Sequence, residues 1–195
     1  MWRCLTGAAL LAGGAFFVLG GCAGDAGIRG RDAPNPGTEP RVQAAGVTVI
    51  PGVPFLPQEE DTCGPSSLAM LLRFLGSDVQ TGEIVRETRT AGLRGTLITD
   101  LAAAARRRGF EAEVVDLDLA RLRERISGGT PVILLVDLGM WVFSRPHYLL
   151  AFGVTPEGVV AHSGREEGKV IPFPTLMARW SKMGRLAVIV QRVAR

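Results

Sequence analysis

Residues 53–76 read VPFLPQEEDTCGPSSLAMLLRFLG, and the helix that this stretch predicts organises the rest of the chain. Leucines recur at helical spacing in its second half, at Leu68, Leu71, Leu72 and Leu75. Asp61 or Thr62 can cap the start of this helix, and Gly76 is placed to end it. Cys63 therefore lies at the N-terminus of the predicted helix.

The position of Cys63 favours a reactive thiolate. Unpaired amides and the positive end of the helix dipole are expected to lower its pKa from the free value of ~8.5. Gly64 leaves the backbone beside the sulfur open, so the Cys63 amide could act as one oxyanion donor. Gln58 could supply a second donor from the preceding loop, or be an ordinary polar loop residue.

The cysteine count isolates Cys63. The chain has three cysteines: Cys4 falls in a predicted signal peptide, and Cys22 is expected to be consumed by lipid. Cys63 is left without a disulfide partner in the folded part, and a lone thiol in an oxidising compartment is exposed to oxidation unless it has a role. By this count alone, it could also be a small buried hydrophobic residue.

The two histidines are the candidates for a base near neutral pH. His147 opens the apolar run HYLLAFGV at residues 147–154, which predicts a buried strand with His147 at its exposed start. His162 lies at the end of the next predicted strand. A catalytic base is needed on a rigid element that opens to a cleft, so His147 is the stronger candidate.

Two motifs resemble a known family. VPFLPQ followed by CGPSSLAM is similar to the start of the bacteriocin-processing leader peptidases, papain-like enzymes that cut after double glycines. The chain looks closest to the stand-alone secreted and lipoprotein relatives of that family, and the resemblance covers residues 47–192. It implies Cys63 as nucleophile and Gln58 as oxyanion-hole residue, and the His-Tyr start at His147 matches the family's second motif.

At a third position the chain departs from the family pattern. The family carries an Asp or Asn after the histidine strand to orient the imidazole, and the best-matching positions here are His162 and Ser163. No carboxylate occupies that place. The orienting contact could come from Ser163, from a main-chain carbonyl, or from an acid elsewhere such as Asp137. Ser163 is therefore included among the candidate catalytic residues.

The N-terminus predicts export and lipid attachment. Residues 1–21 combine a basic end, an apolar run shorter than a ~20-residue membrane helix, and a small-residue cleavage site, as signal peptides do. The sequence LGGC that ends at Cys22 resembles a bacterial lipobox, so Cys22 is expected to carry lipid. Residues 22–46 are the expected flexible tether, and 47–195 the single folded domain. Ala23 after Cys22 favours the outer membrane, facing the periplasm.

The remaining patterns predict an α+β domain, with a helical half before most of the strands. Thr96 can cap one of the helices. The resemblance implies a papain-like fold, in which the Cys helix packs against an antiparallel sheet that carries the His. The expected helices are 82–90, 97–109, 119–126 and 174–180, and the expected strands are 110–115, 131–136, 147–154, 159–161, 170–172 and 186–190.

These observations predict a cysteine peptidase that acts on a peptide or protein of the cell envelope. Two alternatives stay open: a Cys-dependent acyltransferase or deamidase, and a non-catalytic papain-like module that binds peptides or proteins. The net charge of +3, which falls to +2 without Arg3, is too small to indicate a nucleic acid partner. The basic cluster at residues 106–108 suits a solvated helix end.

No cofactor or metal is expected, because the Cys and His spacings lack the paired short intervals of zinc sites. The chain shows no transporter region, and its expected membrane contact is the N-terminal lipid.

Overall fold

The computed structural model describes residues 46–59, 61–89, 95–140 and 142–193. The predicted signal peptide, Cys22 and nearly all of the predicted tether lie outside these residues. One compact unit spans Glu39–Arg195. Within the described ranges, no helix has the length and apolar character needed to cross a bilayer.

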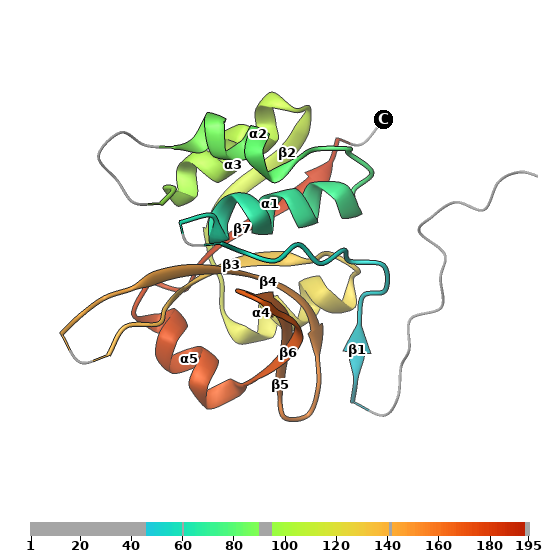
Figure 1. Ribbon diagram of the computed structural model, residues 1–195. Helices are drawn as coiled ribbons and strands as arrows, with labels where there is room; N and C mark the ends of the chain where they lie inside the picture. Colours follow the sequence, from blue (N-terminus) through green and yellow to red (C-terminus); the bar gives the residue numbers. More distant parts are fainter. Residues whose placement is uncertain (1–45, 60, 90–94, 141, 194–195) are drawn as a thin grey trace, which may run out of the picture. The chain divides into compact units, whose positions relative to one another are not determined.

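An antiparallel sheet of seven strands forms the centre of this unit (Figure 1). Its strand order is β2-β7-β3-β4-β5-β6, and β1 pairs with the C-terminal end of β4. The strands are β1 Thr48–Val49, β2 Phe110–Asp116, β3 Val132–Asp137, β4 Pro146–Val154, β5 Gly158–Ser163, β6 Glu166–Pro172 and β7 Leu186–Arg192.

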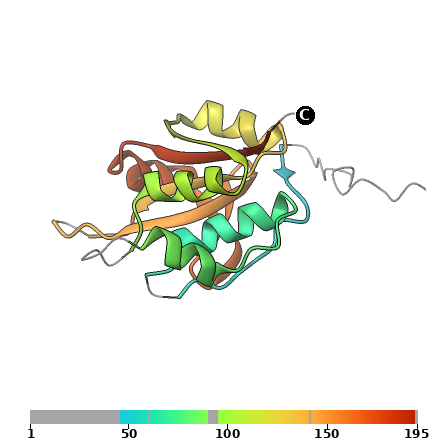
Figure 2. The same ribbon diagram turned by 90° about the horizontal axis from the view of Figure 1, so that it is seen from above.

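Helices cover both faces of the sheet (Figures 1 and 2). Helices α1, α2 and α3 pack on one face, and α4 and α5 pack on the other. The helices are α1 Cys63–Phe74, α2 Thr81–Thr88, α3 Ile98–Arg107, α4 Leu119–Ser127 and α5 Phe173–Ser181. Both hydrophobic clusters consist of residues between 50 and 190, so the unit contains its own complete core.

Strand β3 shows how the two clusters form. All six of its residues are buried, because successive side chains point to opposite faces and both faces are covered. Ile133 joins the cluster under α1–α3, and Leu134 joins the cluster under α4 and α5. Removing a leucine side chain as buried as Leu134 from such a core costs about 2–5 kcal/mol.

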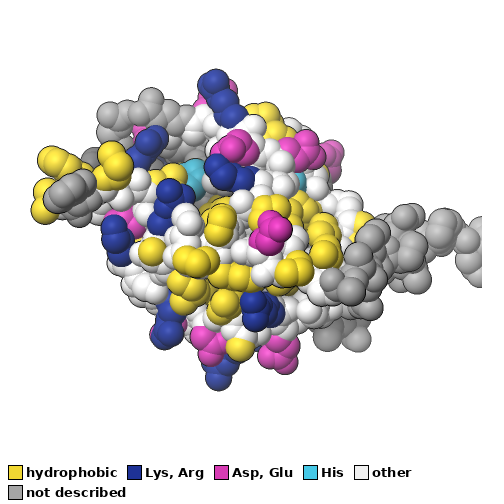
Figure 3. All heavy atoms as spheres, turned by 90° about the horizontal axis from the view of Figure 1, so that it is seen from below, with side chains coloured by type: hydrophobic (Ala, Val, Ile, Leu, Met, Phe, Trp, Pro, Cys, Tyr) yellow, Lys and Arg dark blue, Asp and Glu magenta, His cyan; other side chains and the backbone are white. Residues whose placement is uncertain are grey.

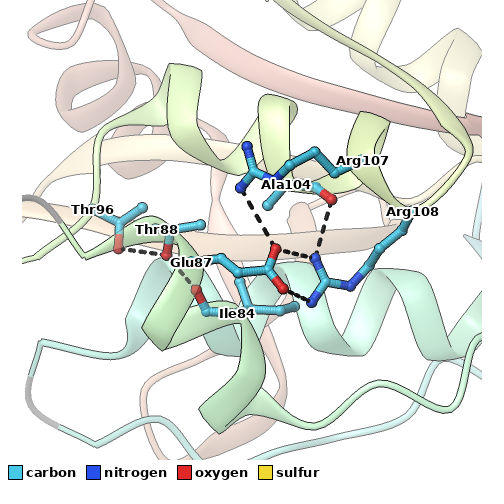
Figure 4. Close-up of polar contacts among 7 residues, drawn as sticks. All are labelled: Ile84, Glu87, Thr88, Thr96, Ala104, Arg107 and Arg108. Atoms are coloured by element: carbon cyan, nitrogen blue, oxygen red, sulfur yellow. Dashed lines mark hydrogen bonds and ion pairs between the residues drawn. The ribbon is translucent and has the colours of Figure 1, made fainter.

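Polar contacts hold α2 and α3 together (Figure 4). The Glu87 carboxylate accepts a hydrogen bond of 2.6 Å from Arg108 Nη2, and it lies 3.5 Å from Arg107 Nη2. These two cations lower the pKa of Glu87, and the hydrogen bond from Arg108 contributes most. The Thr96 hydroxyl lies 3.3 Å from the Thr88 hydroxyl. Thr96 therefore does not cap α3 as predicted; Leu97 precedes the helix, without a side-chain cap.

The predicted α+β fold, with an antiparallel sheet against the Cys helix, is confirmed. The sequence reading missed β1, which has only two residues, and saw only the last part of β6. Strand β6 lies at the edge of the sheet, and its first residues are Glu166, Glu167, Gly168 and Lys169. Polar residues protect such an edge, and they also remove the apolar signal by which strands are predicted.

Two irregularities shape the sheet beside His162. The register of β4 with β5 shifts between Ala151 and Gly153, and that of β5 with β6 shifts between Ala161 and Ser163. A bulge bends a strand and changes the direction of the side chains beside it. Gly153 meets the need for space there, because a Cβ at this position would lie 2.9 Å from the Val160 Cβ.

Candidate active site

Cys63 is the first residue of α1. Thr62 precedes the helix, but its side chain makes no capping hydrogen bond to α1; its hydroxyl bonds back to the main chain of Glu59 instead. The sulfur is partly buried, and the main-chain amides of Tyr148, Gly64 and Cys63 itself lie against it.

Burial raises the pKa of the Cys63 thiol above its ordinary value, and this effect outweighs the lowering by the three amides. The prediction of a lowered pKa at the helix N-terminus is therefore wrong for the resting chain. The sequence indicates that Cys63 begins a helix, but it does not indicate that the folded chain buries the sulfur away from water.

Gly64 allows α1 to approach β4 closely. A Cβ at position 64 would lie 3.0 Å from the Tyr148 ring, nearer than a side chain can be without a shift of its neighbour. Because Tyr148 follows His147 in β4, this approach brings the start of α1 to the strand that carries the histidine. The Tyr148 hydroxyl donates to the Thr96 main-chain oxygen at 2.9 Å, which fixes the ring between α1 and the start of α3.

The His147 imidazole contacts Ser163. Its Nε2 lies 3.1 Å from the Ser163 hydroxyl, across the pair formed by β4 and β5. Burial, followed by the positive charges of Arg145 and Arg179, lowers the pKa of His147 to about 4. The ring is therefore neutral at pH 7, and Nδ1 has no hydrogen-bond partner among the described residues.

Asp137, one of the residues considered for orienting His147, has another role. Its Oδ1 accepts hydrogen bonds from the amides of Gly139 and Arg145, each at 2.7 Å. These bonds lower the pKa of Asp137 and close the loop between β3 and β4. Of the three orienting partners that the sequence left open, Ser163 is the one whose contact with the His147 ring is seen.

Gln58 is buried and held at both ends of its amide. Its Oε1 accepts from the Gly164 amide at 2.8 Å, and its Nε2 donates to the Ser67 hydroxyl at 3.0 Å. An amide nitrogen carries two hydrogens, so one remains for another acceptor. Ser67 is four residues after Cys63 in α1, hence on the same face of the helix. The Gln58 side-chain amide therefore lies against the face of α1 that contains Cys63 and Ser67.

One turn holds both the imidazole and the Gln58 amide. Ser163 contacts His147, and the next residue, Gly164, bonds to Gln58 through its amide and also accepts from the Gln58 main-chain amide at 2.9 Å. Gly164 has a φ of 63°, a conformation that a side chain would strain. The turn between β5 and β6 therefore couples the positions of these two candidate residues.

His162 is a structural residue of this arrangement. Its Nδ1 accepts from the Gly168 amide at 3.1 Å, so the ring is neutral with its proton on Nε2, which lies 3.3 Å from the Val53 oxygen. The rings of Phe55 and Phe152 lie 5.2 and 4.3 Å from it. His162 fastens the segment that leads to Gln58 onto the sheet. The sequence did not indicate this role, because both of its hydrogen-bond partners are main-chain groups.

The described residues contain no group of three or more His, Cys, Asp or Glu side chains that could hold a metal ion. A cavity of about 190 Å³ borders Ser163, between the sheet and α5. Apolar side chains form most of its wall: Val136, Leu138, Leu149, Ile171 and Leu176.

No curated protein matches this sequence. Among solved structures, a protein from Bacillus anthracis described as a C39-like peptidase has a TM-score of 0.62 at 18% identity, over 75% of this chain and 98% of that one. The peptidase domain of Streptococcus ComA, a bifunctional ABC transporter, has a TM-score of 0.59 at 21% identity, over 70% and 96%.

A double glycine motif protease from an AMS/PCAT transporter, solved with its leader peptide, has a TM-score of 0.60 at 20% identity. That match covers 80% of this chain and 96% of the protease. These structures confirm the papain-like fold expected from the resemblance. The model of the Peptidase C39 family matches residues 54–188, which is more than half of the chain. The chain belongs to the Peptidase C39 family.

Proposed function

We propose that this protein is a cysteine peptidase in which Cys63 attacks a peptide carbonyl and His147 accepts the thiol proton. One observation carries the proposal. The Cys63 sulfur lies against the N–H of the peptide bond between His147 and Tyr148 in β4, and Ser163 at the end of β5 contacts the imidazole of that same His147. Membership of the Peptidase C39 family supports a peptide or protein as the substrate.

The reaction begins from an uncharged pair. Burial favours the thiol form of Cys63 and the neutral form of His147. The proton therefore passes from sulfur to the imidazole Nδ1 as the sulfur–carbon bond forms, instead of leaving beforehand. For Nδ1 to be the basic nitrogen, the single N–H of the neutral ring is on Nε2, which donates a hydrogen bond to the Ser163 oxygen.

The oxyanion is stabilised by two donors, the Cys63 amide and the free hydrogen of the Gln58 side chain. The imidazolium then gives its proton to the leaving amine, and the acyl group stays on sulfur as a thioester. His147 next takes a proton from water, the hydroxide attacks the thioester, and the proton returns to the sulfur.

The test uses a peptide probe with a thiol-reactive end group, together with a library of fluorogenic peptides. Replacement of Cys63 by Ala should abolish both labelling and turnover, and His147→Ala should reduce turnover by more than about 100-fold. Thr88→Ala, remote from the thiol, is the matched control for folding. Turnover by the Cys63→Ala variant at the wild-type rate would disprove the assignment of the nucleophile.

A second candidate is a papain-like module that binds a peptide without cutting it. The raised pKa of Cys63 and the hydroxyl of Ser163 in place of a carboxylate favour this alternative. Isothermal titration with library peptides, followed by mass spectrometry of the same samples, separates the two functions. Intact peptide after saturating binding indicates the module; two fragments indicate the peptidase; an altered mass without a cut indicates acyl transfer or deamidation.

We further propose that the chain is exported, lipidated on Cys22 and held at the outer membrane by the tether 22–46, with the catalytic domain in 47–195. The LGGC sequence at residues 19–22 and Ala23 support this location. Mass spectrometry of the purified N-terminus should find diacylglycerol on Cys22. An unmodified Cys22 behind an intact signal segment would contradict the proposal.

A further inference from the structure

The loop between β3 and β4 presents the most exposed large hydrophobic side chains in the described part of the chain. Met140 is 74% exposed, Val142 is 90% exposed and Phe143 is 79% exposed. The other exposed large hydrophobic residues described are Leu97, Val170 and Val193, which are 41–52% exposed and come from separate elements. We call Met140, Val142 and Phe143 the apolar tip.

The loop that carries the apolar tip has a defined shape. The Phe143 amide donates to the Met140 oxygen at 3.1 Å, and Leu138 and Arg145 pair across the base of the loop at 2.9 Å. Asp137 binds two amides of the same loop, as described above. Gly139 is required, because a Cβ there would overlap the Phe143 oxygen. The side chains are thus exposed by a built turn that extends away from the sheet (Figures 1 and 2).

Three basic side chains lie near the base of this loop, beside the Asp137 carboxylate. Arg145 and Arg179 both lie close enough to His147 to lower its pKa, and Lys182 lies close enough to Asp137 to lower its pKa. Figure 3 shows basic side chains next to hydrophobic ones at the end of the molecule to which the loop extends. The combination is a narrow apolar projection with cations behind it.

The shape of the apolar tip selects its partner. Peptides and small molecules bind in concave sites, and the tip is convex. A second protein surface needs roughly 800 Å² per partner, which is more than three side chains of a turn offer. A lipid bilayer, in contrast, accepts a thin apolar projection with an aromatic residue, and anionic headgroups attract the cations behind it. We propose that the apolar tip inserts into the interfacial layer of an anionic membrane.

Insertion would fix the orientation of the candidate active site, since His147 follows Phe143 by four positions. The catalytic groups would lie at the bilayer surface and favour peptide segments held there; this consequence rests on the proposed peptidase function.

Vesicle sedimentation of the unit Glu39–Arg195, which lacks Cys22, tests the insertion alone. The vesicles contain phosphatidylethanolamine and phosphatidylglycerol, or phosphatidylcholine only. We expect binding to the anionic vesicles that weakens with salt, and a partition coefficient about tenfold or more lower for Val142→Ser/Phe143→Ser. The matched control Leu97→Ser/Val170→Ser, which removes two exposed hydrophobic side chains elsewhere, should stay within about twofold of wild type.

Several results would overturn the proposal. Absence of binding to every vesicle, or equal loss in the tip variant and its control, would exclude insertion by the tip. Dimers that dissociate only in the tip variant, without vesicle binding, would assign the tip to a second copy of the chain. The Cys63→Ala variant should bind vesicles as wild type does, so failure of the peptidase proposal would leave this result unchanged.

Discussion

Replacing Ser163 by Asp would supply the charge that the His147 site lacks. The Ser163 oxygen lies 3.1 Å from His147 Nε2, so an aspartate there would bring a negative charge to about 4 Å from the ring. At an effective dielectric constant of about 20, this attraction favours the imidazolium by about 4 kcal/mol, or roughly 3 pKa units. Desolvation of the new carboxylate opposes it, so we expect a net rise of about 1–2 units.

The assay follows alkylation of Cys63 by iodoacetamide as a function of pH. In the wild type the raised pKa of the Cys63 thiol keeps it mainly protonated near neutral pH, so alkylation should be slow there and rise into the alkaline range. An imidazolium stabilised by Ser163→Asp lowers the thiol pKa in turn. The variant should react about five- to tenfold faster near pH 5–6, where its imidazole is protonated and that of the wild type is mostly neutral.

A control variant separates the effect of the negative charge at position 163 from the effect of the hydrogen bond to His147. Ser163→Asn keeps a hydrogen-bonding group without a charge and should leave the alkylation profile close to that of the wild type. A folded Ser163→Asp variant whose profile coincides with the wild type would show that position 163 is not electrostatically coupled to the Cys63–His147 pair. The reasoning from the 3.1 Å contact would then fail.

Four further outcomes are expected. His147 has a pKa of about 4 in the folded chain, below its ordinary 6.5, so the unfolded chain binds the proton first as the pH falls. The free energy of unfolding should therefore fall by up to about 3 kcal/mol between pH 6.5 and pH 4. His147→Asn should flatten this pH dependence, as measured by urea titration. Peptide turnover should likewise decline as the pH drops through about 4, measured as kcat/KM. Gln58→Ala should reduce kcat by about 100-fold or more in the fluorogenic assay, and an unchanged kcat would remove Gln58 from the oxyanion hole. Gly64→Ala should lower the free energy of unfolding by about 1–3 kcal/mol, because the new methyl group meets the Tyr148 ring; an undiminished urea midpoint would contradict the close approach.

The spacing of apolar residues along the chain predicted most of the helices and strands. The helix that starts at Cys63, the strand that starts near His147 and most other elements were predicted within a few residues. Such elements depend on spacing along the chain, which the sequence states directly. Predicted caps were less successful: Thr62 and Thr96 bond to Glu59 and Thr88 instead, because a hydroxyl can choose between several nearby partners.

The Cys63 and His147 positions could be proposed from the sequence because few residues can act as nucleophile and base, and because both lie in recognisable motifs. The tertiary structure alone decided how they are supported. Ser163 and Gly164 meet His147 and Gln58 only after β5 pairs with β4, and burial of the sulfur raises a pKa that its helix position would lower. These effects depend on contacts between distant segments and on the exclusion of water, neither of which has a signature in local sequence spacing.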